Sequence, residues 1–176
     1  MVRKLSNDEL NRLSVPAFKA SEKLQVVLVL DNLRSLNNIG SIFRTADAFR
    51  VEKICLCGIT GTPPHREIQK TALGATESVV WEYFHHTQDA ILDLKSAGYV
   101  LIGVEQTDAS QMLQAFSPAR NGKYALVFGN EINGVSPEVI EKVDIFLEIP
   151  QFGVKHSFNV SVSVGIILWH IFLRNK

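Results

Sequence analysis

Six short apolar segments, alternating with stretches of helical periodicity, constrain the fold of this chain more than any other feature of its sequence. The first runs from Leu24 to Leu30 and is rich in β-branched residues, which is typical of a strand buried on both faces of a sheet. Five more strands are predicted at Lys53–Cys57, Val79–Tyr83, Tyr99–Glu105, Tyr124–Phe128 and Ile145–Ile149. Because strands that alternate with helices form βαβ units, we expect an α/β fold with a mainly parallel sheet flanked by helices.

The helices between these strands are predicted from periodicity and from capping residues. Apolar residues recur every three or four positions from Ile39 to Phe49, so a helix is expected to begin near Asn38, with Arg44 off its apolar stripe. Further helices are predicted near Glu67–Leu73, Gln88–Ala97 and Pro137–Lys142.

The segment from Asn159 to Arg174 is apolar on nearly every side. A helix of this composition must be buried on more than one face. It is too short, and too often interrupted by polar residues, to span a bilayer; the interruptions are Ser161, Ser163 and His170. We therefore expect this helix to pack on its own sheet and against a second subunit.

The N-terminal residues predict a short helical arm, residues 1–20, ahead of a single domain of residues 21–176. Ser6 and Glu9 match a capping box, and apolar residues follow at roughly helical spacing until Pro16 interrupts them. A chain of 176 residues is long enough for one such domain to bury its own core.

The net charge of the chain does not indicate a nucleic-acid partner. Lys and Arg total 18, as do Asp and Glu, so RNA would have to bind through a local basic patch. Candidate members of such a patch are Arg3, Lys4, Arg12, Lys19, Arg34, Arg44, Arg50, Lys155, Arg174 and Lys176. A solvated surface of mixed charge is the alternative interpretation of this scatter.

The cysteines and the N-terminal residues indicate the cellular compartment in which the protein is expected. Cys55 and Cys57 match no metal-ligand spacing, which favours a reduced, cytoplasmic environment. The first eleven residues are polar and lack the apolar core of a signal peptide, so secretion is not expected.

Polar, glycine-bearing loops follow three of the predicted strands, at residues 37–44, 128–136 and 149–162. Ligands of open parallel sheets bind at the carboxyl ends of strands, so these loops are where a site is expected. Each loop also has an ordinary explanation: Asn38 could cap a helix, Arg44 could pair with Asp47 or Glu52, and the glycines could serve tight turns. The occurrence of all three at strand ends favours a shared site.

In this order and at these spacings, the three loops resemble motifs 1, 2 and 3 of the SpoU (TrmH-family) branch of the SPOUT RNA methyltransferases. Motif 1 is matched by Asn38 and Arg44, motif 2 by Gly129, Glu131 and Gly134, and motif 3 by Ile149, Pro150 and residues 157–162. The similarity covers residues 24–173. It implies a SPOUT α/β knot, in which the C-terminal helix is threaded through a loop to form a trefoil knot. It also implies a homodimer through the C-terminal helix, with an active site built from both subunits.

The resemblance implies that S-adenosyl-L-methionine is the cofactor, held largely by backbone groups of Gly129, Ile149 and Phe158. A neutral adenine is well recognised by backbone donors and acceptors in an apolar pocket. Phe158 departs from the family, which commonly has leucine at this position, but the exchange should be tolerated because the main chain makes the bonds. No metal is implied.

The resemblance makes Arg44 the central catalytic residue, with Asn38, Glu131, Ser157 and Asn159 as the other catalytic positions. A ribose hydroxyl is a poor nucleophile, so methyl transfer requires positioning and help in removing the proton. A guanidinium normally stays protonated. We therefore hypothesise that Arg44 either orients the hydroxyl and the adjacent phosphate or acts as a base only with the assistance of that phosphate.

The function implied is methylation of a ribose 2′-hydroxyl in RNA. The short arm, in place of a separate N-terminal RNA-binding domain, favours tRNA, with a guanosine of the D-loop as a candidate nucleotide. The alternatives are an rRNA 2′-O-methyltransferase, or a non-catalytic RNA-binding or assembly protein on the same fold. A dehydrogenase is disfavoured, because residues 32–36 supply no glycine for a dinucleotide-binding turn.

Overall fold

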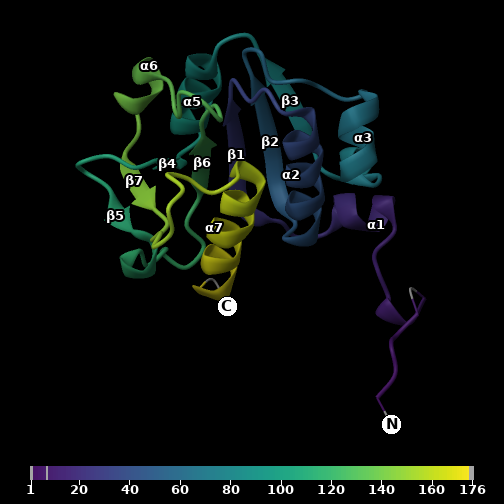
Figure 1. Cartoon of the computed structure of the whole chain (residues 1–176). Helices are drawn as coiled ribbons and strands as arrows, with labels where there is room; N and C mark the ends of the chain where they lie inside the picture. Colours follow the sequence, from purple (N-terminus) through teal and green to yellow (C-terminus); the bar gives the residue numbers. More distant parts are fainter. Residues whose placement is uncertain (1, 7, 175–176) are drawn as a thin grey trace.

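A sheet of seven parallel strands, with helices on both faces, makes up the computed structural model, which describes residues 2–6 and 8–174 (Figure 1). In chain order the strands are β1 (Leu24–Asp31), β2 (Val51–Cys57), β3 (Trp81–Phe84), β4 (Val100–Val104), β5 (Gln111–Met112), β6 (Tyr124–Phe128) and β7 (Ile145–Glu148). Their order in the sheet is β3-β2-β1-β6-β4-β7-β5, and every pairing is parallel. The predicted α/β class is thus confirmed, and the carboxyl ends of β1, β6, β4 and β7 lie along one edge.

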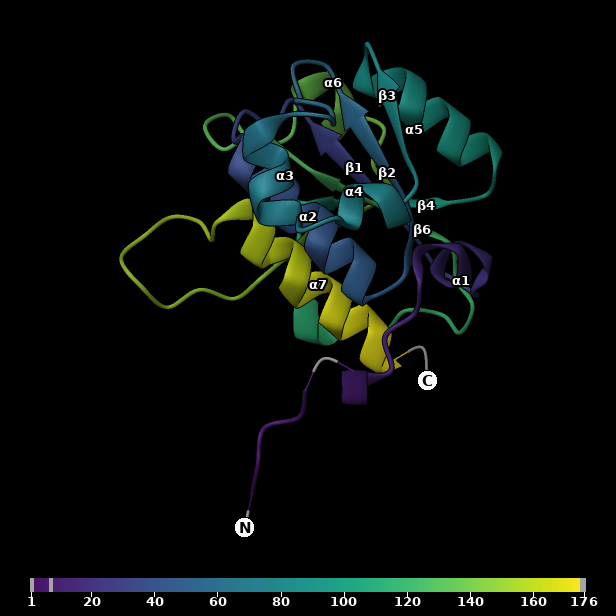
Figure 2. The same cartoon turned by 90° about the vertical axis from the view of Figure 1, so that its right-hand side faces the viewer.

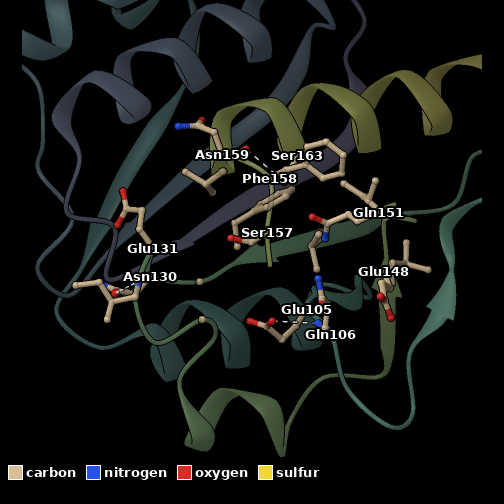
Figure 3. Close-up of a pocket in the computed structure, with 18 residues that line it drawn as sticks. Glu105, Gln106, Asn130, Glu131, Glu148, Gln151, Ser157, Phe158, Asn159 and Ser163 are labelled. Atoms are coloured by element: carbon tan, nitrogen blue, oxygen red, sulfur yellow. Dashed lines mark hydrogen bonds between the residues drawn. The ribbon is translucent and has the colours of Figure 1, made fainter. Parts of the chain in front are cut away.

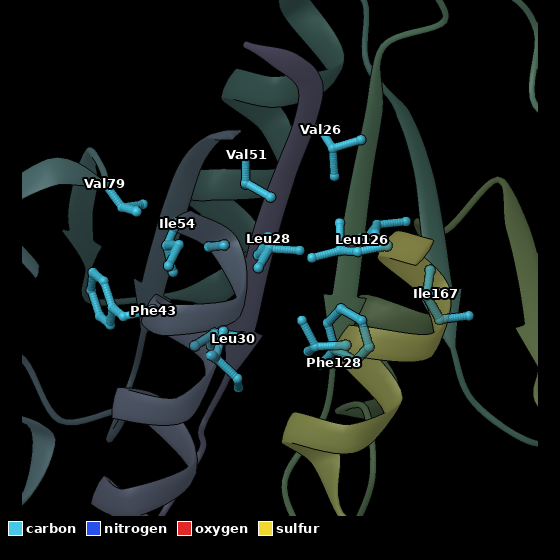
Figure 4. Packing of buried hydrophobic residues seen from close by; sticks show 14 of the residues in the cluster. Val26, Leu28, Leu30, Phe43, Val51, Ile54, Val79, Leu126, Phe128 and Ile167 are labelled. Atoms are coloured by element: carbon cyan, nitrogen blue, oxygen red, sulfur yellow. The ribbon is translucent and has the colours of Figure 1, made fainter. Parts of the chain in front are cut away.

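Two apolar cores fill the space between the sheet and its helices, because the side chains of successive strand residues point to opposite faces. Val26, Leu28 and Leu30 of β1 pack with Phe43 and Ile167 on one face (Figure 4). Val27 and Val29 pack on the other face. The helices are α1 (Val15–Ala20), α2 (Leu36–Ala48), α3 (Arg66–Ala72), α4 (Ala75–Ser78), α5 (Thr87–Ser96), α6 (Pro137–Ile140) and α7 (Val160–Arg174). Figure 2 shows α2 and α7 side by side on one face and α5 on the other.

All six strands predicted from the apolar segments are present, with ends that differ by a few residues. The edge strand β5 was not predicted, because its two residues are exposed and belong to no apolar run. The four-residue α4 was also not predicted. Cys55 and Cys57 are buried and free, and burial raises the pKa of both thiols, that of Cys55 to about 12. Thiols in this state are not reactive nucleophiles.

The N-terminal arm differs from its prediction in where the helix begins. Glu9 accepts hydrogen bonds from the backbone and the hydroxyl of Ser6, but only a 3-10 turn follows, at Asp8–Leu10. The α-helix begins later, at Val15, where Ser14 caps it and Pro16 lies in the first turn. Proline is favoured in a first turn because its missing N–H would have no partner there. Pro16 therefore opens a helix rather than interrupting one.

Helix α7 is buried on one side and partly exposed on another. Val164, Ile167, Leu168 and Ile171 are fully buried in the core, which confirms that the helix packs on its own sheet. Exposed residues form a second stripe along α7, which we call the α7 stripe: Val162, Trp169 and Leu173, each about half exposed. None of the described helices has the length and apolar content needed to cross a membrane. The trefoil knot stays a prediction.

Candidate active site

A pocket of about 420 Å³ lies at the carboxyl ends of β4, β6 and β7, beside the first turn of α7 (Figure 3). Residues from motifs 2 and 3 line it, among them Gly129, Glu131, Ile149, Ser157, Phe158 and Asn159. The structure therefore brings together three of the predicted catalytic residues and all of the predicted cofactor-binding residues. These positions lie up to 30 residues apart in the chain and converge because parallel strands end at the same edge of the sheet.

A chain of hydrogen bonds links the three motifs beside this pocket. The Glu131 carboxylate accepts from the backbone N–H of Arg34 and of Ser35, each at 3.1 Å. The same carboxylate accepts from the side-chain amide of Asn38 at 3.3 Å. Asn159 in turn donates to the side-chain oxygen of Asn38 at 3.0 Å. The Asn38 side chain is thus held from both sides, since its amide nitrogen donates to Glu131 and its amide oxygen accepts from Asn159.

The Glu131 carboxylate is held in its ionised form. Burial acts to raise the pKa of Glu131, but the hydrogen bonds from Arg34, Ser35 and Asn38 outweigh it, and the pKa lies below its ordinary value. The carboxylate also lies at the N-terminus of α2, where the helix dipole favours a negative charge. Ser35, not Asn38, caps this helix, since the Ser35 hydroxyl accepts from the Asn38 backbone N–H. The side chain of Asn38 is therefore not occupied by capping.

The loop after β6 brings backbone, rather than side chains, to the wall of the pocket. Asn130 and Gly134 exchange two backbone hydrogen bonds, each of 2.9 Å, and so close the loop into a tight hairpin. A Cβ atom at Gly129 would lie 2.0 Å from the carbonyl carbon of Gly134. Gly134 itself has a φ of +68°, in the left-handed region that favours glycine. Side chains are excluded at both positions, so Gly129 and Gly134 contribute only backbone to the wall of the pocket.

The lining of the pocket combines apolar and acidic side chains. Phe128, Leu147, Ile149, Phe158 and Val160 provide apolar surface. The charged side chains are those of Glu105, Glu131 and Glu148, and no Lys, Arg or His is among the described residues that line the pocket. A pocket that combines apolar patches with a net negative charge suits a ligand that carries both a flat apolar group and a positive charge.

Arg44 does not line this pocket in its own chain. It follows Asn38 by six residues on α2, so the two side chains project from different sides of the helix. Arg44 is exposed, and among the described residues it has no ion pair or hydrogen bond, so the expected alternative of a pair with Asp47 or Glu52 is not observed. It lines a separate groove beside α1, together with Arg12 and Arg50. Of the other basic candidates, Lys176 lies outside the described residues.

Sequence reasoning missed Glu105, Gln106 and Gln151, which also line the pocket. Glu105 and Gln106 follow β4 and Gln151 follows β7, so strand ends were again the informative signal. Glu105 and Gln106 went unnoticed because the segment after β4 carries no glycine, whereas Gln151 lies within the expected loop 149–162 but at no motif position. The described residues contain no group of three His, Cys, Asp or Glu side chains arranged to hold a metal ion.

Comparison with known proteins identifies similar chains. The family model described as the SpoU rRNA Methylase family matches residues 25–169. A Staphylococcus saprophyticus protein named "Putative TrmH family tRNA/rRNA methyltransferase" is 30% identical over 158 residues. The match covers 90% of this chain and 62% of that relative, so this chain spans less than two thirds of the relative's length.

Two solved structures share the fold. One is a TrmH/SpoU tRNA modifying enzyme from A. aeolicus, with a TM-score of 0.78 and 27% identity over 89% of this chain and 78% of that one. The other is an AdoMet-bound rRNA methyltransferase from Sinorhizobium meliloti, with a TM-score of 0.78 and 26% identity over 85% of this chain and 56% of that one.

Proposed function

Because the chain belongs to the SpoU rRNA methylase family, we propose that it transfers a methyl group from S-adenosyl-L-methionine to a ribose 2′-hydroxyl of RNA. The observation that carries the proposal is the pocket in which motifs 2 and 3 meet, joined to motif 1 through Asn38. S-adenosylmethionine supplies a methyl group on a positively charged sulfur. The remaining requirements are to bind this cofactor, to place the hydroxyl in line with the methyl group, and to help remove the proton.

The residues of the pocket fit this cofactor. The backbone of Gly129, together with that of Ile149 and Phe158, lines the pocket and can bond the adenine, and the apolar side chains can cover its faces. The carboxylates of Glu105 and Glu148 lie where they can stabilise a cation. The relative from Sinorhizobium meliloti was solved with AdoMet bound, which supports the same ligand here.

We assign the arginine of the active site to a second copy of the chain. Val162, Trp169 and Leu173, which form the α7 stripe, lie at intervals of seven and four residues and give the helix a face on which an identical helix can pack. Val160 and Ser163 of the same helix line the pocket, so a partner seated on α7 lies beside the pocket mouth. Since α2 lies next to α7, Arg44 of the partner subunit can then reach the pocket.

Within this arrangement the polar residues have separate roles. Arg44 of the partner subunit orients the ribose hydroxyl and the adjacent phosphate. Ser157 and Asn159 position the nucleotide at the pocket, and Glu131 holds Asn38 in place. The guanidinium acts as a proton acceptor only with assistance from the RNA phosphate, because it otherwise stays protonated.

We favour tRNA as the substrate over rRNA, with a guanosine of the D-loop as the first nucleotide to test. The tRNA modifying enzyme from A. aeolicus supports this choice, because the match covers 78% of its chain, against 56% for the rRNA methyltransferase from Sinorhizobium meliloti.

The test is methyl transfer from labelled S-adenosylmethionine to total tRNA and to rRNA, followed by nucleoside mass spectrometry. We expect label in a 2′-O-methylnucleoside of tRNA. Label in rRNA alone would overturn the tRNA preference, and label on a base would overturn the ribose assignment. Tight RNA binding with no transfer to any RNA would favour the non-catalytic assembly protein.

A further inference from the structure

Residues 149–158, the segment between β7 and α7, line the pocket at both ends, through Ile149 and Gln151 and through Ser157 and Phe158, and make few contacts with the rest of the protein. Residues 152–158 are exposed and form no helix or strand. Among the described residues, one hydrogen bond ties this segment to another part of the chain: the side-chain amide of Gln106 donates to the backbone oxygen of His156 at 3.0 Å. Phe158, predicted to bind the cofactor, lies two residues beyond His156.

Gln106 is itself held firmly. The preceding residue, Glu105, donates its backbone N–H to Leu147 of β7 at 3.2 Å. The Glu105 carboxylate accepts from the Gln106 backbone N–H at 3.0 Å (Figure 3). The backbone oxygen of Glu105 accepts from the hydroxyl of Ser110 at 2.8 Å, and this hydrogen bond closes the turn that follows. The side chain of Gln106 therefore projects from a rigid turn at the end of β4.

The same turn also fixes the loop on the other side of the pocket. The second oxygen of Glu105 accepts from the backbone N–H of Val135 at 3.0 Å. A Cβ atom at Gly134 would lie 2.2 Å from this oxygen, so the glycine leaves the space that Glu105 fills. One short segment, residues 105–106, thus joins the loop after β6 to the segment after β7, and both of these form walls of the pocket.

We propose that Gln106 is a positioning residue for the cofactor pocket: by holding His156, it fixes the neighbouring Ser157 and Phe158 in the wall of the pocket and so sets the affinity for the ligand. The proposal rests on the proposed function in one respect, namely that the ligand is S-adenosylmethionine. It predicts that affinity depends on a hydrogen-bond donor at position 106 and not on the charge there.

Two substitutions separate these causes. Gln106→Glu keeps the shape of the side chain but loses the donor, whereas Gln106→Lys keeps a donor. If charge alone mattered, a cationic cofactor would bind more tightly to Gln106→Glu and more weakly to Gln106→Lys. If the hydrogen-bond donor determines the affinity, Gln106→Lys binds the cofactor more tightly than Gln106→Glu does. Gln114→Glu is the matched control, because Gln114 is exposed and its side chain makes no hydrogen bond with a described residue.

The experiment is calorimetric titration of each full-length variant with S-adenosylmethionine, together with hydrogen exchange of the ligand-free proteins. We expect Gln106→Glu to bind about three- to tenfold more weakly, the ratio expected for one hydrogen bond. We expect faster exchange in residues 151–158 of this variant and unchanged exchange in β1 and β6. Gln106→Lys and Gln114→Glu should resemble the wild type.

Each remaining outcome has a definite meaning. Equal affinity of Gln106→Glu and the wild type, or weaker binding by Gln106→Lys than by Gln106→Glu, overturns the proposal. Exchange that accelerates throughout the sheet would show general destabilisation and would also overturn it. If the wild type binds no S-adenosylmethionine, the proposed function is wrong, and the exchange of residues 151–158 alone then decides whether Gln106 orders this segment.

Discussion

The side-chain amide of Asn159 donates a 3.0 Å hydrogen bond to the side-chain oxygen of Asn38, although 121 residues separate the two in the chain. The contact joins the start of α7 to the first turns of α2. The side-chain amide of Asn38 in turn donates to Glu131, whose carboxylate accepts hydrogen bonds from the backbone at the start of α2. A substitution of either asparagine should therefore change the position of the other side chain.

Replacement of Asn38 by alanine should reduce methyl transfer by about tenfold or more, because it removes both side-chain hydrogen bonds, to Glu131 and from Asn159, that join motif 1 to motifs 2 and 3. Asn37→Ala is the matched control, since its side chain is exposed and makes no hydrogen bond with a described residue. Single-turnover rates with saturating cofactor measure the effect. Equal rates for the two variants would show that the asparagine chain does not position reacting groups.

Mixing two inactive variants should restore activity if each active site draws on two subunits. Arg44→Ala removes the guanidinium, and Gly129→Ala places a Cβ atom 2.0 Å from Gly134 and so disrupts the pocket. Co-expressed in equal amounts, the two should regain about a quarter of the wild-type rate, because half of the dimers then contain one complete site. Mixtures that stay inactive while mixed dimers form would contradict the shared site.

Introducing a charge on the α7 stripe should separate the subunits. Leu173 is 51% exposed, and we expect Leu173→Glu to be monomeric, because a carboxylate would be buried in the apolar contact that the α7 stripe makes. Leu92→Glu is the control, since Leu92 is similarly exposed, at 58%, but lies on α5, on the opposite face of the sheet. Light scattering after gel filtration measures the mass of each. A dimeric Leu173→Glu protein would place the interface elsewhere.

The lowered pKa of Glu131 should make part of the stability depend on pH. The folded state favours the ionised form, so its contribution is complete above the ordinary pKa of glutamate, about 4.3, and is lost as pH falls through the lower folded value. Because Glu131 is exposed, we expect about 1 kcal/mol or less. Urea unfolding of wild type and Glu131→Gln should show a difference that is constant near neutrality and shrinks in acid. A difference that grows in acid would contradict the assignment.

Gly40 should prove to be required for packing rather than for chemistry. A Cβ atom there would lie 2.1 Å from the Thr71 hydroxyl and 2.3 Å from the backbone oxygen of Ile68, so α2 and α3 would have to move apart. We expect Gly40→Ala to lower the free energy of unfolding by about 1–3 kcal/mol. Gly153→Ala, where no atom lies within 4 Å of the added Cβ, should have little effect. Thermal and urea unfolding measure both.

Much of the fold was predictable because burial leaves a pattern in sequence. β1 and β6 are central strands, almost entirely buried, and each appears as a short apolar run. β5 lies at the edge, is exposed and has two residues, so no periodic signal marks it. Pro16 was misjudged because a proline can end one helix or open the next, and only the Ser14 cap decides between them.

The candidate site was predictable where motifs occur at strand ends, and not where a single contact decides the role of a residue. Glu131, Ser157 and Asn159 were predicted together and lie together. Gln106 belongs to no motif, and its hydrogen bond to His156 can be found only in the structure. Arg44 was predicted to be at the site, but in its own chain it lines a separate groove, which its place in motif 1 does not reveal.

The register that places Val26 of β1 beside Tyr124 of β6 also determines when during synthesis a pocket can exist. The first central strand emerges from the ribosome long before its neighbour, and the last wall of the pocket, at Ser163, belongs to the final helix. We therefore expect a nascent chain that stops before α7 to hold no cofactor, so that the competence to bind it arises only after this helix has been translated.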